Sequence, residues 1–445
     1  MKKLLLLALA IVVAFVAPAF AEVQNVKVGG DITSYYEQTT NLNLTKTNTN
    51  ASSDNFFMTT TRLYVSADLT DNVQTYVRII NERTWDSKFN TANDGSDASE
   101  EDAVQLDLAY VKLSEFLYSP LTMIIGRQEI KWGSGLVVGN GNPVPNNKLQ
   151  LRDSFLSARK GFDAARAILN FEPWTIDSFA SRIANGSNAF DPAVPSYDGR
   201  FENLYGLNVS YVWPSEWVTE GYYVYNTDKD TSVGSDSLFS KVSTVGLRTE
   251  GHVKPIDEKL YLEAELAYQF GKYDASRDIK SWAGILGTSY EFANQYKPVV
   301  GVKYDYRSGN KTADTGDYKG WNAKYNDYQI GNIINKVWTN GYKSLNSDVR
   351  GNGGNIHAIT TTGSVVPMQD VELSLDWVWA TSDQAIFVGN SKNIGNEFIG
   401  TVKYDYTEDV TMSLMGSVFD PKGAFRTTTE KEKAYEVIGS VAVEF

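Results

Sequence analysis

The side chains that most often carry out catalysis are scarce in this chain. Of its 445 residues two are histidines, His252 and His357, and none is cysteine. Cysteine-based metal sites and disulfides are therefore excluded, and neither histidine has a companion residue at metal-ligand or catalytic-triad spacing. Gly-x-Ser-x-Gly, His-Glu-x-x-His and glycine-rich phosphate-binding motifs are also missing. We expect that the protein is not an enzyme and binds no cofactor. The one alternative with catalytic activity is an outer-membrane hydrolase in which His252 or His357 activates a serine.

Acidic residues outnumber basic ones. The net charge is −13, and nucleic acid is excluded as a partner because it requires a basic footprint. Residues 93–102 gather carboxylate and amide oxygens that could hold calcium, but their spacing departs from the EF-hand loop. We expect these side chains to be solvated, or bridged to lipopolysaccharide through divalent ions, and predict no metal site.

The N-terminus has the pattern of a secretory leader. Two lysines precede an apolar run that extends from Leu4 to Val16, and Ala19-Phe20-Ala21 provides a small-residue cleavage site. Residues 1–21 are thus a predicted signal peptide, and residues 22–445 form one predicted domain. Beyond Val16 no stretch approaches the roughly 18 apolar residues that a membrane helix needs.

Hydrophobic residues then alternate with polar ones. Leucines, tyrosine and phenylalanine share one parity in residues 260–270, and glutamates and glutamine share the other; residues 371–379 behave in the same way. A helix would mix these faces, so the pattern predicts two-faced strands. Each segment is about 9 to 13 residues long, which is the length of a membrane strand.

The connections between these strands alternate between short and long. The short ones lie at about 70–72, 114–120, 171–173, 214–216, 254–259, 293–297, 367–370 and 407–409. The long ones lie at about 40–55, 82–104, 128–160, 183–202, 227–240, 271–279, 308–354, 381–394 and 420–432. Eight turns and nine loops predict an all-β fold, a transmembrane antiparallel β-barrel of about 18 strands with short periplasmic turns and long outer loops. The first strand, about residues 26–39, should pair with the last, which ends at the aromatic Phe445.

If the aliphatic parity faces lipid, the opposite parity lines the lumen. The predicted pore-lining residues are Arg62, Arg78, Asp107, Arg127, Glu129, Arg166, Arg248, Glu263, Glu265, Lys303, Asp305, Arg307, Glu372 and Asp376. Two interpretations remain open. A basic arc could face an acidic one and impose a transverse field on the water, or the charges could pair across neighbouring strands and keep the lumen wet.

One region resembles a known family. Residues 124–133 read Ile-Ile-Gly-Arg-Gln-Glu-Ile-Lys-Trp-Gly, and residues 160–166 read Lys-Gly-Phe-Asp-Ala-Ala-Arg. These segments resemble the Gly-Arg-Gln and Phe-Asp-Gly motifs of the alginate-export porins, and residues 106–113 resemble the family's fourth strand with Asp107 in place of glutamate. The resemblance implies a monomeric eighteen-stranded outer-membrane barrel that acts as a channel.

The resemblance also implies that Arg127, and with less support Arg166, belong to a basic constriction for an anionic polysaccharide. Two departures argue against alginate as the solute: the barrel is acidic, with Glu129 close to Arg127, and Ala164 replaces the expected glycine. An alternative for the Gly-Arg-Gln motif is structural, with Gly126 bending a strand and Arg127 anchoring the loop that follows.

Two loops are candidates for narrowing the lumen. Loop 128–160 is rich in glycine and proline and long enough to fold inward, so it is the predicted constriction. In loop 308–354, residues 330–338 have helical apolar spacing. That helix could plug the mouth or pack on the outer rim.

The predicted function is a passive channel in the outer membrane of a Gram-negative-type bacterium, for small polar or charged solutes or an oligosaccharide. The expected partners are outer-membrane lipid and lipopolysaccharide, the β-barrel assembly machinery through Phe445, and the solute. The alternative from another class is a plugged barrel with a structural or adhesive role, which an absence of conductance would reveal.

Overall fold

The computed structural model describes residues 24–42, 44, 53–85, 104–139, 157–183, 201–229, 239–311, 316–339, 353–385, 391–425 and 431–445. Its strands are β1 (Gln24–Thr40), β2 (Asp54–Thr70), β3 (Val73–Trp85), β4 (Gln105–Leu113), β5 (Leu121–Glu129), β6 (Gly161–Phe171), β7 (Trp174–Ile183), β8 (Phe201–Val212), β9 (Val218–Lys229), β10 (Phe239–His252), β11 (Leu260–Lys272), β12 (Asp278–Glu291), β13 (Val299–Arg307), β14 (Ile356–Met368), β15 (Val371–Thr381), β16 (Asn393–Thr407), β17 (Val410–Pro421) and β18 (Ala434–Glu444). The short helix η2 (Asn335–Thr339) lies between β13 and β14.

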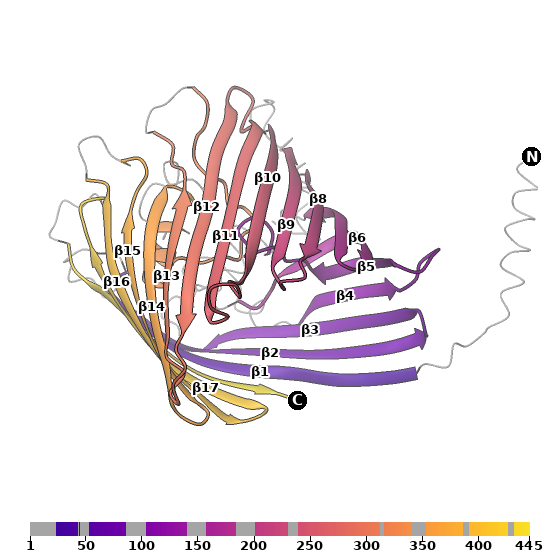
Figure 1. Cartoon of the computed structure of the whole chain (residues 1–445), viewed down its shortest axis with the longest axis horizontal. Helices are drawn as coiled ribbons and strands as arrows, with labels where there is room; N and C mark the ends of the chain where they lie inside the picture. Colours follow the sequence, from indigo (N-terminus) through magenta and orange to yellow (C-terminus); the bar gives the residue numbers. More distant parts are fainter. Residues whose placement is uncertain are drawn as a thin grey trace, which may run out of the picture.

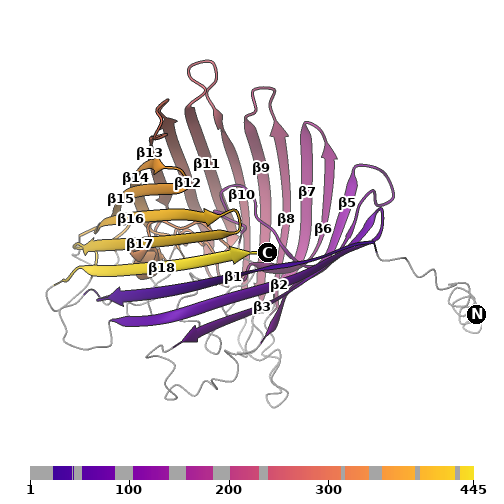
Figure 2. The same cartoon turned by 90° about the horizontal axis from the view of Figure 1, so that it is seen from below.

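The strands form a closed antiparallel barrel. Each strand pairs with the next along the chain, and β1 pairs with β18 from Asp31 opposite Glu444 to Thr40 opposite Tyr435. Figure 2 shows the indigo β1 beside the yellow β18. The backbone N–H groups of Gly30 and Phe445 each donate to the other residue's carbonyl oxygen, at 2.8 and 3.0 Å. The predicted pairing of first and last strands is confirmed, and the ring has no unpaired edge.

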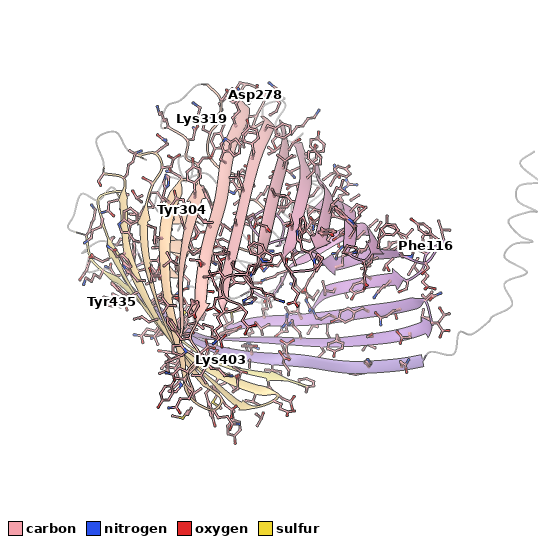
Figure 3. The ribbon with its side chains drawn as sticks, in the orientation of Figure 1. Phe116, Asp278, Tyr304, Lys319, Lys403 and Tyr435 are labelled. Atoms are coloured by element: carbon pink, nitrogen blue, oxygen red, sulfur yellow. The ribbon has the colours of Figure 1, made fainter. Side chains whose placement is uncertain are left out.

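Short and long connections alternate as predicted. Turns of two to seven residues follow the even-numbered strands, and connections of nine or more residues follow the odd-numbered ones, except that five residues join β11 to β12. In Figure 3, Asp278 and Lys319 mark the loop end of the barrel and Phe116 marks the turn end. Within the described residues no helix is long and apolar enough to cross a membrane. The predicted signal peptide and the acidic segment 93–102 lie outside the described residues.

The outer surface of the ring is apolar. Leu247, Leu286 and Leu375 are each more than half exposed. Ile285, which precedes Leu286 on β12, is buried. This alternation runs along the strands because successive side chains point to opposite faces. The exposed parity therefore provides a surface suited to hydrocarbon.

The buried core lies inside the ring. One cluster joins residues of η2 and the segment before it to the inner faces of β14 to β18. A second cluster joins residues 130–138 and 321–325 to the inner faces of β6 to β9, β11 and β12. The core is thus made where loop segments meet the barrel wall (Figure 1).

The two faces of the wall should respond differently to a charge. Leu286→Arg places a guanidinium on the apolar surface near the middle of β12, and should destabilise the barrel in lipid by about 2–4 kcal/mol. Thr362→Arg adds the same group to the inner face of β14 and should cost much less. Urea unfolding in bilayers, followed by tryptophan fluorescence, measures both changes, and equal destabilisation would contradict the assigned faces.

Candidate functional site

The segment after β5 folds into the lumen, as predicted for loop 128–160. The Trp132 indole N–H donates to Asp177 Oδ2 at 2.7 Å, and the Ser134 hydroxyl donates to Glu265 Oε2 at 2.6 Å. Between them Gly133 has a φ of 54°, and a Cβ at this position would lie 2.9 Å from the Arg248 side chain. A glycine is needed here because the backbone is left-handed and rests directly on the wall.

A second segment, from loop 308–354, lies beside the first. Lys324 forms ion pairs with Glu202 and Asp228, and the Tyr325 hydroxyl donates to Glu202. Residues 138 and 325 form a parallel bridge, and the backbone N–H of Asp327 donates to the carbonyl of residue 135 at 2.9 Å. The two inner segments, 130–139 and 316–339, therefore support each other inside the barrel.

The helical spacing predicted for residues 330–338 corresponds to the approach to η2 and to η2 itself, inside the wall. Ile333, Ile334 and Val337 have no exposed surface. The Glu397 carboxylate, on β16, accepts the backbone N–H groups of Asn332, Ile333 and Ile334 at 2.6 to 3.2 Å. These are the unpaired donors at a helix start, so Glu397 caps the helix from the barrel wall.

The same helix is attached to the closing strands. Lys336 Nζ lies 2.9 Å from Glu37 Oε1 on β1 and also pairs with Glu436 on β18. Both carboxylate side chains have no exposed surface. Of the two positions left open for this segment, the interior of the barrel is the one observed.

The predicted lumen charges form ion pairs across neighbouring strands. Arg62 pairs with Asp31 at 2.9 Å, and Arg166 pairs with Asp177 at 2.6 Å. The further pairs are Arg78 with Asp107 and Glu129, Arg248 with Glu220, Glu250 and Glu265, and Lys303 with Glu263. This is the arrangement of the second interpretation, in which charges pair locally.

Of the remaining predicted residues, two are buried and two have solvent-accessible side chains. Arg307 is 1% exposed, and its guanidinium donates to the carbonyls of Gly353 and Tyr328. Asp305 is buried beside it. Glu372 and Asp376 share the inner parity of β15, opposite to the exposed Leu375, and neither forms an ion pair in the described part of the chain.

Arg127 is found on the outer face. Phe162 contacts the inner segment at Tyr325, with ring centroids 6.3 Å apart, so the neighbouring Asp163 points outward and is half exposed. Arg127 pairs with Asp163 at 3.3 Å and lies over Gly161, which has the same outward parity. Its Nε also donates to the carbonyl of Asp107 at 2.9 Å. An outward guanidinium does not support a role for Arg127 in a basic constriction.

Strand β5 bends at Gly126, as expected if the Gly-Arg-Gln motif has a structural role. Gly126 has a φ of 125°, and the Gln128 side chain donates to the carbonyls of Ile124, Gly126 and Ala164. The Gly-Arg-Gln motif thus shapes the wall at the point where the chain turns inward.

The histidines have partners other than serine. His357 Nδ1 lies 2.7 Å from the Tyr304 hydroxyl, and its Nε2 lies 3.6 Å from Asp383. His252 packs edge-on against the Tyr261 ring. In the described ranges no hydrogen bond joins either imidazole to a serine hydroxyl, and no group of acidic or histidine side chains could hold a metal ion.

Sequence reasoning missed the carboxylates that hold the inner segments, namely Asp177, Glu202, Glu37, Glu397 and Glu436. Their inward parity was visible in the sequence. Their partners are 45 to 299 residues away along the chain, as with Trp132 and Asp177 or Lys336 and Glu37, so strand periodicity could not reveal them.

Removing the cap should loosen the helix. Glu397→Ala leaves three buried N–H donors unpaired, at a cost of about 1–3 kcal/mol, so the amides of residues 332–334 should exchange with deuterium about 5- to 150-fold faster. Glu408→Ala, which removes an exposed carboxylate in a turn, is the control. Unchanged exchange in Glu397→Ala would contradict the capping role.

Known proteins resemble this chain mainly in fold. OprD of Pseudomonas aeruginosa superposes with a TM-score of 0.56 at 9% identity, covering 96% of this chain and 97% of that one. OccAB1 of Acinetobacter baumannii gives 0.56 at 10% identity, covering 96% and 99%. A BenF-like porin from Pseudomonas fluorescens gives 0.55 at 10%, covering 95% and 99%.

A search of curated protein sequences finds no match. Residues 24–438 match the sequence profile described as alginate export. Since this match spans nearly the whole barrel, the chain belongs to the alginate export family.

Proposed function

We propose that this barrel is a passive outer-membrane channel for small polar or charged solutes, or for an oligosaccharide. The observation that carries the proposal is the closed ring of eighteen strands with paired charges on its inner face. A barrel of this strand number has a lumen too wide for wall side chains to fill. Charged groups on that face keep the lumen hydrated, and the apolar outer face suits lipid.

The inner segments would set the width of the path. Segments 130–139 and 316–339 are attached to the inner wall at Glu265, Glu202 and Glu397. Toward the turn end, wall residues such as Glu372 and Lys403 remain exposed. A wide vestibule that leads to a narrower, loop-lined passage is the arrangement we propose.

A plugged barrel is the second candidate. The observation that favours it is the dry packing of η2 and the residues before it, where Ile333, Ile334, Val337 and Trp338 are at most 1% exposed. A helix packed in this way could block the passage rather than narrow it. Conductance distinguishes the two functions, because a structural or adhesive barrel needs no open path. The described contacts of His252 and His357 provide no serine that would support the hydrolase alternative.

The location and partners follow from the same proposal. The apolar belt would contact outer-membrane lipid, and the outer loops would contact lipopolysaccharide. Phe445 is 61% exposed at the end of the closing strand, where the assembly machinery could bind it.

Single-channel recording in a planar bilayer tests the channel. The purified protein should give sustained conductance steps. Glu397→Ala should give larger steps because η2 loses its cap and can move from the wall, whereas Glu408→Ala should match the parent protein. A folded protein that never conducts, either as the parent or as Glu397→Ala, would overturn the channel and favour the plugged barrel.

A further inference from the structure

We propose that the lumen selects for cations, so that the permeant solutes are small molecules with an ammonium or guanidinium group, and Asp376 and Glu372 are determinants of this selectivity. The inference rests on the proposed channel function. The ion pairs along the inner wall show whether acidic or basic side chains are in excess there.

Two arginines on the wall are outnumbered by the carboxylates around them. Arg78 contacts both Asp107 and Glu129. Asp107 Oδ1 is buried and accepts no hydrogen bond, so this cluster holds more acceptors than its arginine satisfies. The Glu129 side chain is 47% exposed, and Glu129 lies opposite Gly161 in the β5–β6 register.

The Arg248 cluster, which lies beside Gly133 and Ser134 of the inner segment, has a larger excess of carboxylates. Its guanidinium contacts the carboxylates of Glu220 and Glu250, and Glu265 lies 3.8 Å away. Ser134 from the inner segment donates to Glu265. One positive charge thus faces three carboxylates beside the loop that narrows the lumen.

The inner segments do not reverse the balance. Lys324 pairs with two carboxylates, Glu202 and Asp228, and Lys336 pairs with Glu37 and Glu436. At these two points the inner segments are held by acidic groups of the wall, whereas Lys131 and Lys160 share the single carboxylate of Asp327.

Two further inward lysines of the wall pair with acidic residues. Lys303 pairs with Glu263, and Lys403 pairs with Asp405. Near the turn end, Lys112 borders a hollow together with Asp68 and Asp71. Inward Lys27, close to the same end, is exposed.

Glu372 and Asp376 on β15 add two carboxylates to the inner wall. Both lie on the inner face of β15 with solvent-accessible side chains and no ion-pair partner among the described residues. Their neighbours across the strands are Thr362, opposite Asp376, and Lys403, opposite Glu372. Because Lys403 already pairs with Asp405, these three carboxylates outnumber the one lysine beside them.

This balance determines which ions are stabilised. An arginine whose N–H groups already donate to carboxylates has few donors left for an anionic solute. Unpaired carboxylates in a low-dielectric wall raise the local concentration of cations and repel anions, and the effect is strongest where the path is narrow. A polyanion would meet the excess negative charge of the Arg248 cluster.

The reversal potential under a tenfold KCl gradient measures the selectivity. The parent channel should pass K⁺ better than Cl⁻. Asp376→Asn, and more strongly Asp376→Asn with Glu372→Gln, should lower the K⁺/Cl⁻ permeability ratio by about twofold or more. Asp163→Asn removes the same charge from the outer face of the barrel and should leave the ratio unchanged.

Each outcome has a separate meaning. A parent channel that prefers Cl⁻, or lumen variants that behave like Asp163→Asn, would overturn cation selectivity while leaving the channel intact. A protein that does not conduct would instead overturn the channel function.

Organic solutes test the proposed class directly. Proteoliposomes with the parent channel should swell faster in isosmotic argininamide, a cation, than in glutamate, an anion, and Asp376→Asn with Glu372→Gln should narrow the difference. Faster swelling in glutamate would overturn the proposed solute class.

Discussion

The pairing of β1 with β18 is the constraint on which the rest of the structure depends. A backbone surrounded by hydrocarbon has no water to satisfy it, so every N–H and C=O must find a partner in the ring. The register from Asp31 opposite Glu444 to Thr40 opposite Tyr435 provides these partners. The same two strands supply Glu37 and Glu436, which hold Lys336 of the inner helix. Closure of the barrel and attachment of its largest inner segment therefore share one seam.

Charge serves two purposes inside this ring. Carboxylates of the wall cap a helix at Glu397, accept the Trp132 indole at Asp177 and pair with Lys324 at Glu202, so they position segments that would otherwise have no fixed place. Lys324 and Lys336 each contact two carboxylates, so the groups that hold these segments also add negative charge to the inner wall. In the selectivity that we propose, positioning of the loops and selection of the solute would have a common electrostatic origin.

The barrel could be predicted from the sequence because the patterns that indicate it involve residues close together in the chain. Alternation with period two and the repeating order of short turns and long loops are both visible within a few residues, and together they gave eighteen strands. The amphipathic spacing of residues 330–338 is local too, and it corresponds to the buried approach to η2 and its first turn.

The site could be predicted only in part because its contacts are distant. Parity correctly indicated that arginines and carboxylates share a face, but not which of them pair. Arg127 shows the limit most clearly: the motif resemblance suggested a constriction, whereas the guanidinium lies on the outer face with Asp163, next to a strand bent at Gly126. Neither the bend nor the partner is encoded in strand periodicity.

The central claim is that the inner face of β15 borders a water-filled path while its outer face contacts lipid. Because the chain has no cysteine, a single one can be introduced as a reporter of water access. Asp376→Cys should react with a charged, water-soluble thiosulfonate reagent and lose conductance as the adduct narrows the path, whereas the adjacent Leu375→Cys should not respond. An unreactive residue 376, or equal responses at both positions, would contradict the account.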